Sequence, residues 1–218
     1  MRRIRLTLII AGLAAVLLTA APSVSATGSP VVAIQHATPT AGRDIPKPSE
    51  CTVEPRSDQE FRALYRDAVT LSSTAASPTT GPVSPTPPPG KPAGDAIVAE
   101  INASWREFIA CLNAGDLARV FALTSDDKLR RDFVVDIANG ATEDMLVPYL
   151  LATPTALDPA TFVPVMPFPD ATMLDDGRVA VVGEGEHGDG EVLIFIKDGD
   201  RWIVDDQWDL SPVGTPAP

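Results

Sequence analysis

Residues able to do metal or nucleotide chemistry gather at one place, between Gly183 and Glu191. Here His187 lies among acidic and glycine residues, and carboxylates on a glycine-rich turn suit Ca²⁺. The spacing matches no standard calcium loop, and a zinc site needs three or four ligands. Gly183, Gly185 and Gly188 fit a dinucleotide-binding pattern, but no helix follows and the acids would repel a pyrophosphate. We therefore expect a solvated hairpin turn, with neither a metal nor a cofactor.

General-base chemistry is the second possibility, at Asp206. Asp205 and Asp206 are neighbours, so in a strand they point to opposite faces and cannot act as a pair. On a regular strand Asp206 shares its face with three apolar residues: Trp202, Val204 and Trp208. Partial burial there would raise its pKa and suit it to proton abstraction, with Tyr149 or His187 as hydrogen-bond donor. The alternative, which we favour, is that the strand ends by Asp206 and this side chain lies in solvent.

Other catalytic arrangements find no support in the residues. No serine has the context of a nucleophile elbow, and the second half of the chain holds a single histidine, so a hydrolytic triad is not expected. Five aromatic residues are candidates for lining a ligand cavity: Trp105, Phe108, Tyr149, Phe195 and Trp202. At helical or strand spacing such rings are more often plain core.

The chain has two cysteines, Cys51 and Cys111. In an exported protein the simplest expectation is a disulfide between them. Closing a loop of about 60 residues stabilises a fold by roughly 4 kcal/mol in the loop-entropy treatment. The alternative is that Cys111 stays a buried thiol while Cys51 pairs with another chain.

Export is indicated by the N-terminus. Three arginines, an apolar run over residues 6–21 and a small-residue pattern ending at Ala26 predict a signal peptide over residues 1–26. An uncleaved anchor is the alternative, but about 16 apolar residues fall short of the roughly 20 needed to span a bilayer. The net charge of −12 becomes more negative after cleavage, which disfavours nucleic acid and anionic membranes as partners. We expect a secreted or extracytoplasmic protein with no stable membrane insertion.

The segments that follow differ sharply in composition. Residues 27–49 lack periodicity and are expected to be disordered, as is the tail 211–218. Residues 50–72 hold a capping box from Ser57 to Glu60 and then an apolar stripe at helical spacing, which predicts a short amphipathic helix. Residues 73–94 are rich in proline and read as a semi-rigid, extended linker.

The elements that must position the candidate residues lie in residues 95–210. Apolar periodicity and capping residues predict helices that begin near Asp95, Asp116, Ser125 and Thr142. Strands are expected over residues 178–183, 191–197 and 201–205. Helices segregated from an antiparallel sheet indicate an α+β fold. The strands are apolar on both faces, so one face should pack on the helices and the other should be covered by the upstream helix or a second subunit.

Two stretches resemble a known family. The string from Trp105 to Leu117, followed by Leu123 to Asp127, resembles the opening helices of the nuclear-transport-factor-two-like superfamily, which includes the SnoaL and ketosteroid-isomerase-like proteins. The hairpin from Phe195 to Asp206 looks like the last two strands of that superfamily. The resemblance implies a cone, in which a curved antiparallel sheet wraps on N-terminal helices around an apolar cavity. Members use that cavity for catalysis, for small-molecule binding or for dimer contacts.

Because fold does not decide function, three functions stay open. We expect an exported, non-catalytic domain that binds a small apolar ligand or a protein partner. The first alternative is an isomerase or lyase that abstracts a proton with Asp206. The second is a structural envelope module that forms a homodimer.

Overall fold

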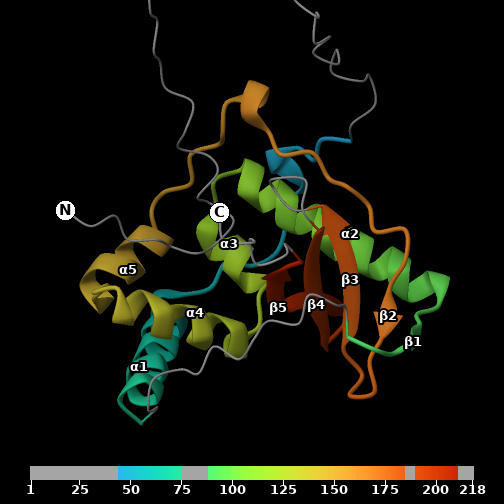
Figure 1. The fold of residues 1–218 in the computed structure, drawn as a ribbon. Helices are drawn as coiled ribbons and strands as arrows, with labels where there is room; N and C mark the ends of the chain where they lie inside the picture. The colour runs from blue at the N-terminus through green and yellow to red at the C-terminus, as the bar shows by residue number, and fades with distance from the viewer. Residues whose placement is uncertain (1–43, 75–87, 185–189, 211–218) are drawn as a thin grey trace, which may run out of the picture.

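The computed structural model describes residues 44–74, 88–184 and 190–210. The α-helices in these ranges are α1 (Asp58–Thr74), α2 (Asp95–Asn113), α3 (Leu117–Ala122), α4 (Asp126–Ala138) and α5 (Glu143–Leu150). Two short 3₁₀-helices, η2 (Pro48–Glu50) and η3 (Pro159–Thr161), lie in the connections. The strands are β1 (Lys91–Pro92), β2 (Thr172–Met173), β3 (Val179–Glu184), β4 (Gly190–Asp198) and β5 (Arg201–Asp209). The fold is α+β, as the sequence predicted (Figure 1).

The strands form one open sheet in the order β1-β2-β3-β4-β5, with every neighbouring pair antiparallel. The three predicted strands correspond to β3, β4 and β5, and the last of these runs further than expected. Strands β1 and β2 are two residues each, and β1 lies inside the segment predicted to be linker. The β4–β5 turn uses Gly199 at a positive φ of 60°, a conformation that favours glycine.

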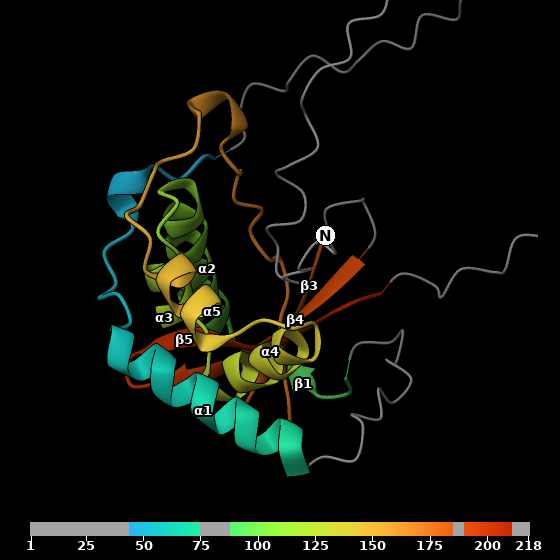
Figure 2. The same ribbon diagram turned by 90° about the vertical axis from the view of Figure 1, so that its left-hand side faces the viewer.

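Helix α2 covers one face of the sheet and forms the main core with it. Its apolar face, which includes Ile101, Phe108 and Ile109, packs on the inward side chains of the strands, such as Leu193 and Val204. In Figure 1 α2 lies behind the sheet, and the turned view in Figure 2 shows it on one side of β3 and β4. We call the other side of the sheet its outer face.

Helix α1 belongs to a second core, made with α3, α4 and α5. The predicted capping box is present, since Ser57 N donates to Glu60 Oε2 (2.7 Å) and Glu60 N to Ser57 Oγ (3.3 Å). The predicted stripe is buried at four positions: Phe61, Leu64, Tyr65 and Ala68. Its fifth member, Val69, is 42% exposed. Helix α1 therefore packs on helices and not on the outer face of the sheet (Figure 2). Of the two covers expected for that face, the upstream helix is wrong, and a second subunit stays a prediction.

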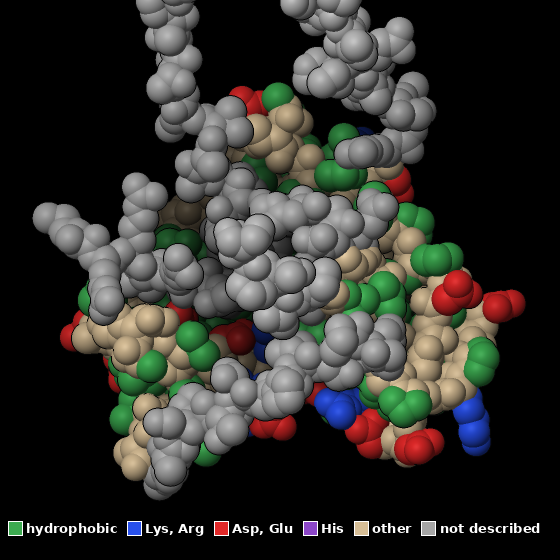
Figure 3. All heavy atoms as spheres, in the orientation of Figure 1, with side chains coloured by type: hydrophobic (Ala, Val, Ile, Leu, Met, Phe, Trp, Pro, Cys, Tyr) green, Lys and Arg blue, Asp and Glu red, His purple; other side chains and the backbone are tan. Residues whose placement is uncertain are grey.

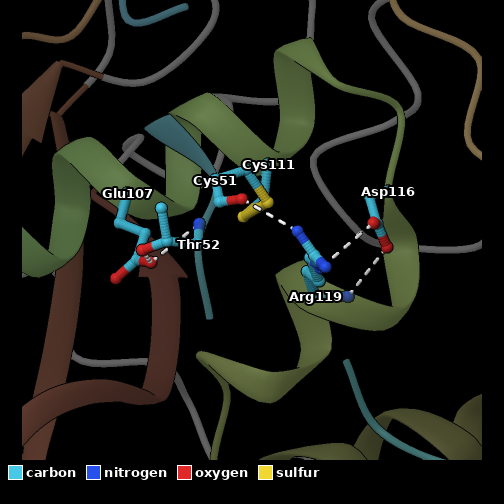
Figure 4. The surroundings of a disulfide bond; sticks show 6 residues. All are labelled: Cys51, Thr52, Glu107, Cys111, Asp116 and Arg119. Carbon is cyan, nitrogen blue, oxygen red and sulfur yellow. Dashed lines mark hydrogen bonds and ion pairs between the residues drawn. A yellow bond between two sulfur atoms is a disulfide. The ribbon is translucent and has the colours of Figure 1, made fainter. Parts of the chain in front are cut away.

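Cys51 and Cys111 form the predicted disulfide, and both residues are buried. Figure 4 shows its surroundings. Arg119 Nη1 donates to the Cys51 carbonyl (2.9 Å), while the backbone N and the hydroxyl of Thr52 donate to Glu107 Oε1 (3.1 and 2.7 Å). These contacts fasten the segment before α1 to α2 and α3.

Order begins earlier than the sequence predicted, because residues 44–49 are part of the fold. Arg106 of α2 forms ion pairs with Asp44 and with Glu50 (2.8 Å to the latter). The buried amide of Asn113 donates to the Pro46 carbonyl (3.0 Å). Polar contacts to α2 hold this segment in place. Such contacts leave no hydrophobic periodicity in the sequence, so the segment could not be predicted as ordered. The predicted signal peptide and C-terminal tail lie outside the described residues.

Candidate functional site

Three of the five aromatic residues expected to line a cavity pack against one another. Trp105 stacks on Phe108 at 5.0 Å between centroids and meets Phe195 edge-on at 6.4 Å. Phe168, which the sequence analysis missed, joins them at 5.7 Å from Trp105 and 6.1 Å from Phe195. Phe168 comes from a proline-rich passage without periodicity, which gave no signal. We assign these rings to the core between α2 and the sheet.

Trp202, a fourth predicted cavity residue, fastens β5 to α2. Its indole Nε1–H donates to Glu100 Oε2 (2.9 Å), and Lys197 Nζ binds the same oxygen (2.6 Å). Lys197 also lies 5.2 Å from the centroid of the Trp202 ring. The hydrogen bonds from Lys197 and then Trp202 hold the pKa of Glu100 below its ordinary value. Trp202 is 5% exposed and is held in this contact.

Tyr149 and His187 are not brought together with the other candidates. Tyr149 lies on α5, where its residue is 47% exposed, so it does not face the core between α2 and the sheet. Its helix contributes other side chains, such as Leu146 and Leu150, to the second core. His187 lies outside the described residues.

Asp206 lies on a different face from the one that strand alternation predicts. Ile194 pairs with Asp206 while Phe195 pairs with Val204, so Asp205 is an extra residue in β5, which makes a β-bulge. The bulge turns the second half of the strand over. Trp202 and Val204 face α2, whereas Asp206 and Trp208 share the outer face. The strand also continues to Asp209 and does not end at Asp206.

The surroundings of Asp206 are those of an ion pair. Its side chain is 42% exposed and lies 3.5 Å from Arg131 Nη2. The buried carboxylate is instead Asp205, which is 7% exposed. It accepts hydrogen bonds from Ser125 Oγ (2.7 Å) and Arg178 Nη1 (3.0 Å). Asp205 thereby joins β5 to the start of α4 and to β3, a structural role.

A row of charged side chains on α4, buried at both ends and half-buried at Asp132, was not predicted from the sequence. Lys128, Asp132 and Asp136 recur every fourth residue, and Lys128 Nζ lies 3.0 Å from Asp132 Oδ2. Burial raises the pKa of Asp132 in spite of Lys128. Burial first, and the nearby Asp132 charge second, raise the pKa of Asp136 to about 6. Charges at this spacing usually form a solvated helix face, so only the packing shows that Asp136 is 3% exposed.

The outer face of the sheet carries a hollow of about 270 Å³ beside β3, which we call the groove. It is lined by Pro169, Asp170, Ala171, Thr172, Ala180 and Val182. Val182 is 44% exposed, whereas further along the face Val192 and Ile194 are buried against Leu174, Trp208 and Leu210. Figure 3 shows hydrophobic side chains exposed over the region of β2 and β3. This surface is mostly apolar and has one carboxylate.

One unsatisfied polar atom lies on the same outer face. The indole Nε1 of Trp208 is buried and has no hydrogen-bond partner among the residues that the structure describes. Trp208 pairs with Val192, which in turn pairs with Val182 at the groove. Buried donors are nearly always bonded, so this one marks a face that is incomplete.

Two asparagines of α2 hold the segment that leads to the groove. Asn102 accepts from Phe168 N (2.7 Å) and donates to Phe168 O (3.0 Å). Asn113 makes the same pair of bonds to Val163, at 2.8 and 3.1 Å. Each side-chain amide thus bonds both the N–H and the carbonyl of one residue, as the backbone of a neighbouring strand would. The clamp at Phe168 fixes the start of the segment 169–172 that borders the groove.

Two further observations concern the described ranges only. They contain no group of three or more histidine, cysteine, aspartate or glutamate side chains placed to hold a metal ion. They contain no helix with the length and hydropathy needed to cross a membrane. Comparison with protein-family models, with curated proteins and with solved structures gives no match for this chain.

Proposed function

We propose that this is an exported, non-catalytic protein that binds a protein partner through the groove on the outer face of its sheet. The observation that carries the proposal is an exposed apolar surface that no described helix covers. Helix α1, one of the two expected covers, packs on α4 and α5 instead. The unbonded indole N–H of Trp208 on the same face adds support, since a partner can complete such a face.

The size of the groove favours a protein over a small apolar ligand. Small-molecule pockets usually enclose about 300–1,000 Å³ and bury most of their ligand. At about 270 Å³ the groove lies at the low end of this range, and it is open on the outer face, so it encloses little of a ligand. Protein interfaces instead depend on a few anchor side chains that fill pockets of this kind within a flatter surface.

The placement of the catalytic candidates supports a non-catalytic role. A general base should be buried or held near a substrate pocket with a donor beside it. Asp206 is half exposed and paired with Arg131, and Tyr149 lies on the surface of α5. Within the described part of the chain, the isomerase or lyase alternative therefore has no base and donor placed together, and His187 lies outside that part.

Two features support export and the proposed family. The disulfide fits an oxidising compartment outside the cytoplasm. The α+β architecture with helices before the main strands fits the nuclear-transport-factor-two-like superfamily, to which we propose that residues 95–210 belong.

A photo-crosslinking residue placed at Val182 in the producing cell tests the proposed function. The matched control is the same residue at Val69 on α1, because the two valines are 44% and 42% exposed. We expect a discrete protein adduct from position 182 and none from position 69, with mass spectrometry identifying the crosslinked peptide.

Other results would contradict the proposal in distinct ways. Equal adducts from both positions, or none from position 182, would remove the groove as a docking site. An adduct of twice the chain mass at position 182 would establish the homodimer instead. A small-molecule adduct there would favour the apolar-ligand alternative.

A further inference from the structure

The groove combines an apolar floor with one carboxylate that has no partner in the described part of the chain. Val182 and Pro169 supply the exposed apolar surface, the buried Ala180 lies at its base, and Asp170 lies at the border. The Asp170 side chain is exposed and makes no hydrogen bond or ion pair with any described residue. A ligand matching this surface needs an aliphatic part and a positive charge.

The cations near the groove are engaged elsewhere or stay apart from Asp170. Arg178, at the start of β3, is bound to Asp176 (2.8 Å) and to Asp205 (3.0 Å). Arg131 is bound to Asp206 and to the Asp205 carbonyl. Lys91 on β1 forms no ion pair with a described residue. The charge of Asp170 is therefore available to a partner.

The net charge of the whole chain also favours a cationic partner. With 17 basic and 29 acidic residues it has a formal charge of −12, so its field attracts cationic partners and repels anionic ones. Lysine and arginine bury an aliphatic stem against apolar surface and keep the charged head in water. One such side chain suits a hollow of about 270 Å³ that has a carboxylate at its border.

We infer that the groove receives a lysine or arginine side chain of the protein partner, with its stem on Val182 and Pro169 and its head at Asp170. This inference rests on the proposed function and specifies the chemistry of the partner. The partner segment is cationic, and its anchor residue is basic.

The test uses fragments that reproduce the anchor side chain. n-Butylammonium is the lysine side chain without its backbone, and 1-butanol and butyrate keep the chain length with a neutral or negative head. Amide NMR titration of the mature protein should place n-butylammonium at Ala171, Thr172 and Val182. We expect it to bind about two- to fivefold more tightly than 1-butanol, as for an exposed ion pair, and butyrate to bind most weakly. Added salt should reduce the difference.

Variants separate the charge from the apolar floor. Asp170→Asn should bring n-butylammonium down to the affinity of 1-butanol. Glu54→Gln, which removes another exposed acid from the segment before α1, should leave the order unchanged. Equal binding of the ammonium and the alcohol, no effect of Asp170→Asn, or shifts that lie elsewhere would overturn the inference. Since crosslinking at Val182 tests the docking surface independently, such a failure would leave the proposed function standing.

Discussion

Asn113 is fully buried and serves two segments distant in sequence, at Pro46 and at Val163. Its amide bonds one carbonyl of the first segment, and both the N–H and the carbonyl of Val163. Each of these backbone groups would lack a partner if the amide were removed. An unsatisfied buried group costs about 1–3 kcal/mol.

We predict that Asn113→Ala lowers the free energy of unfolding by about 2–4 kcal/mol. Urea unfolding of the mature, disulfide-bonded protein measures this loss. Gln59→Ala, on the exposed surface of α1, is the control and should change stability by less than about 0.5 kcal/mol. Equal effects of the two substitutions would mean that the hydrogen bonds of the Asn113 side chain do not hold these segments.

Asp136 is the residue through which stability should respond to pH. Its pKa rises from an ordinary 3.8 to about 6 in the folded protein. Between these values the folded state keeps a proton that the unfolded state has already lost. The free energy of unfolding therefore falls as the pH rises through that window. Once the pH is above the folded pKa, the total loss is about 2–3 kcal/mol.

We predict that Asp136→Asn stabilises the protein by about 2 kcal/mol at pH 7.5 and that the gain shrinks toward zero near pH 4. Urea midpoints at several pH values measure it. The exposed Asp200→Asn is the control and should change little at any pH. A gain that does not depend on pH would show that burial of the Asp136 charge is not its source.

At the residue scale, the sequence predicted the strand face of some single side chains, but not which residues from different elements form a common surface. Alternation correctly put the side chains of Trp202 and Val204 on the same face of the sheet. It wrongly put Asp206 on that face too, because the sequence pattern does not reveal a β-bulge. The groove could not be predicted from the sequence, because its lining comes from β3, from the two-residue strand β2 and from the passage before β2, which has no periodicity. A binding surface of this kind depends on register, which one strand alone does not reveal.

At the element scale the helices and the three long strands could be predicted, since each carries caps or an apolar repeat. The start of α4 illustrates this, where the Ser125 hydroxyl accepts from Lys128 N (3.1 Å). Strands β1 and β2 could not, because two residues are too few to show alternation. Pro92 has no backbone N–H to donate, but proline is tolerated at the edge of a sheet, where β1 lies.

The disulfide is the contact between elements that should matter most for stability. We predict that replacing Cys51 and Cys111 together by serine lowers the free energy of unfolding by about 2–5 kcal/mol. Reduced wild-type protein should match the double variant. Thermal or urea unfolding with and without reductant gives the comparison, and no difference between oxidised and reduced protein would contradict a stabilising bond.

Peptide mapping checks the pairing itself. Under non-reducing conditions we expect one crosslinked peptide pair that contains Cys51 and Cys111. Free thiols at both positions, or a pair that joins two chains, would contradict the intramolecular bond.

At the scale of the whole molecule, the N-terminal pattern predicts export and cleavage of a signal peptide. We predict that the mature protein begins at Thr27, because the pattern ending at Ala26 is a cleavage signal. Intact-mass analysis of protein recovered outside the cytoplasm measures this. Recovery of the full-length chain in the membrane fraction would contradict cleavage.

The position of the disulfide also has a mechanical consequence. The bond joins Cys51 to Cys111, 60 residues further on. If the two ends of the chain are pulled apart, the force passes directly through the sulfur atoms, and residues 52–110, α1 among them, bear no load. Reduction would add that length to the stretched chain, roughly 200 Å at full extension. While the bond is intact, tension on the N-terminal side therefore reaches the end of α2 without peeling α1 from the helices on which it packs.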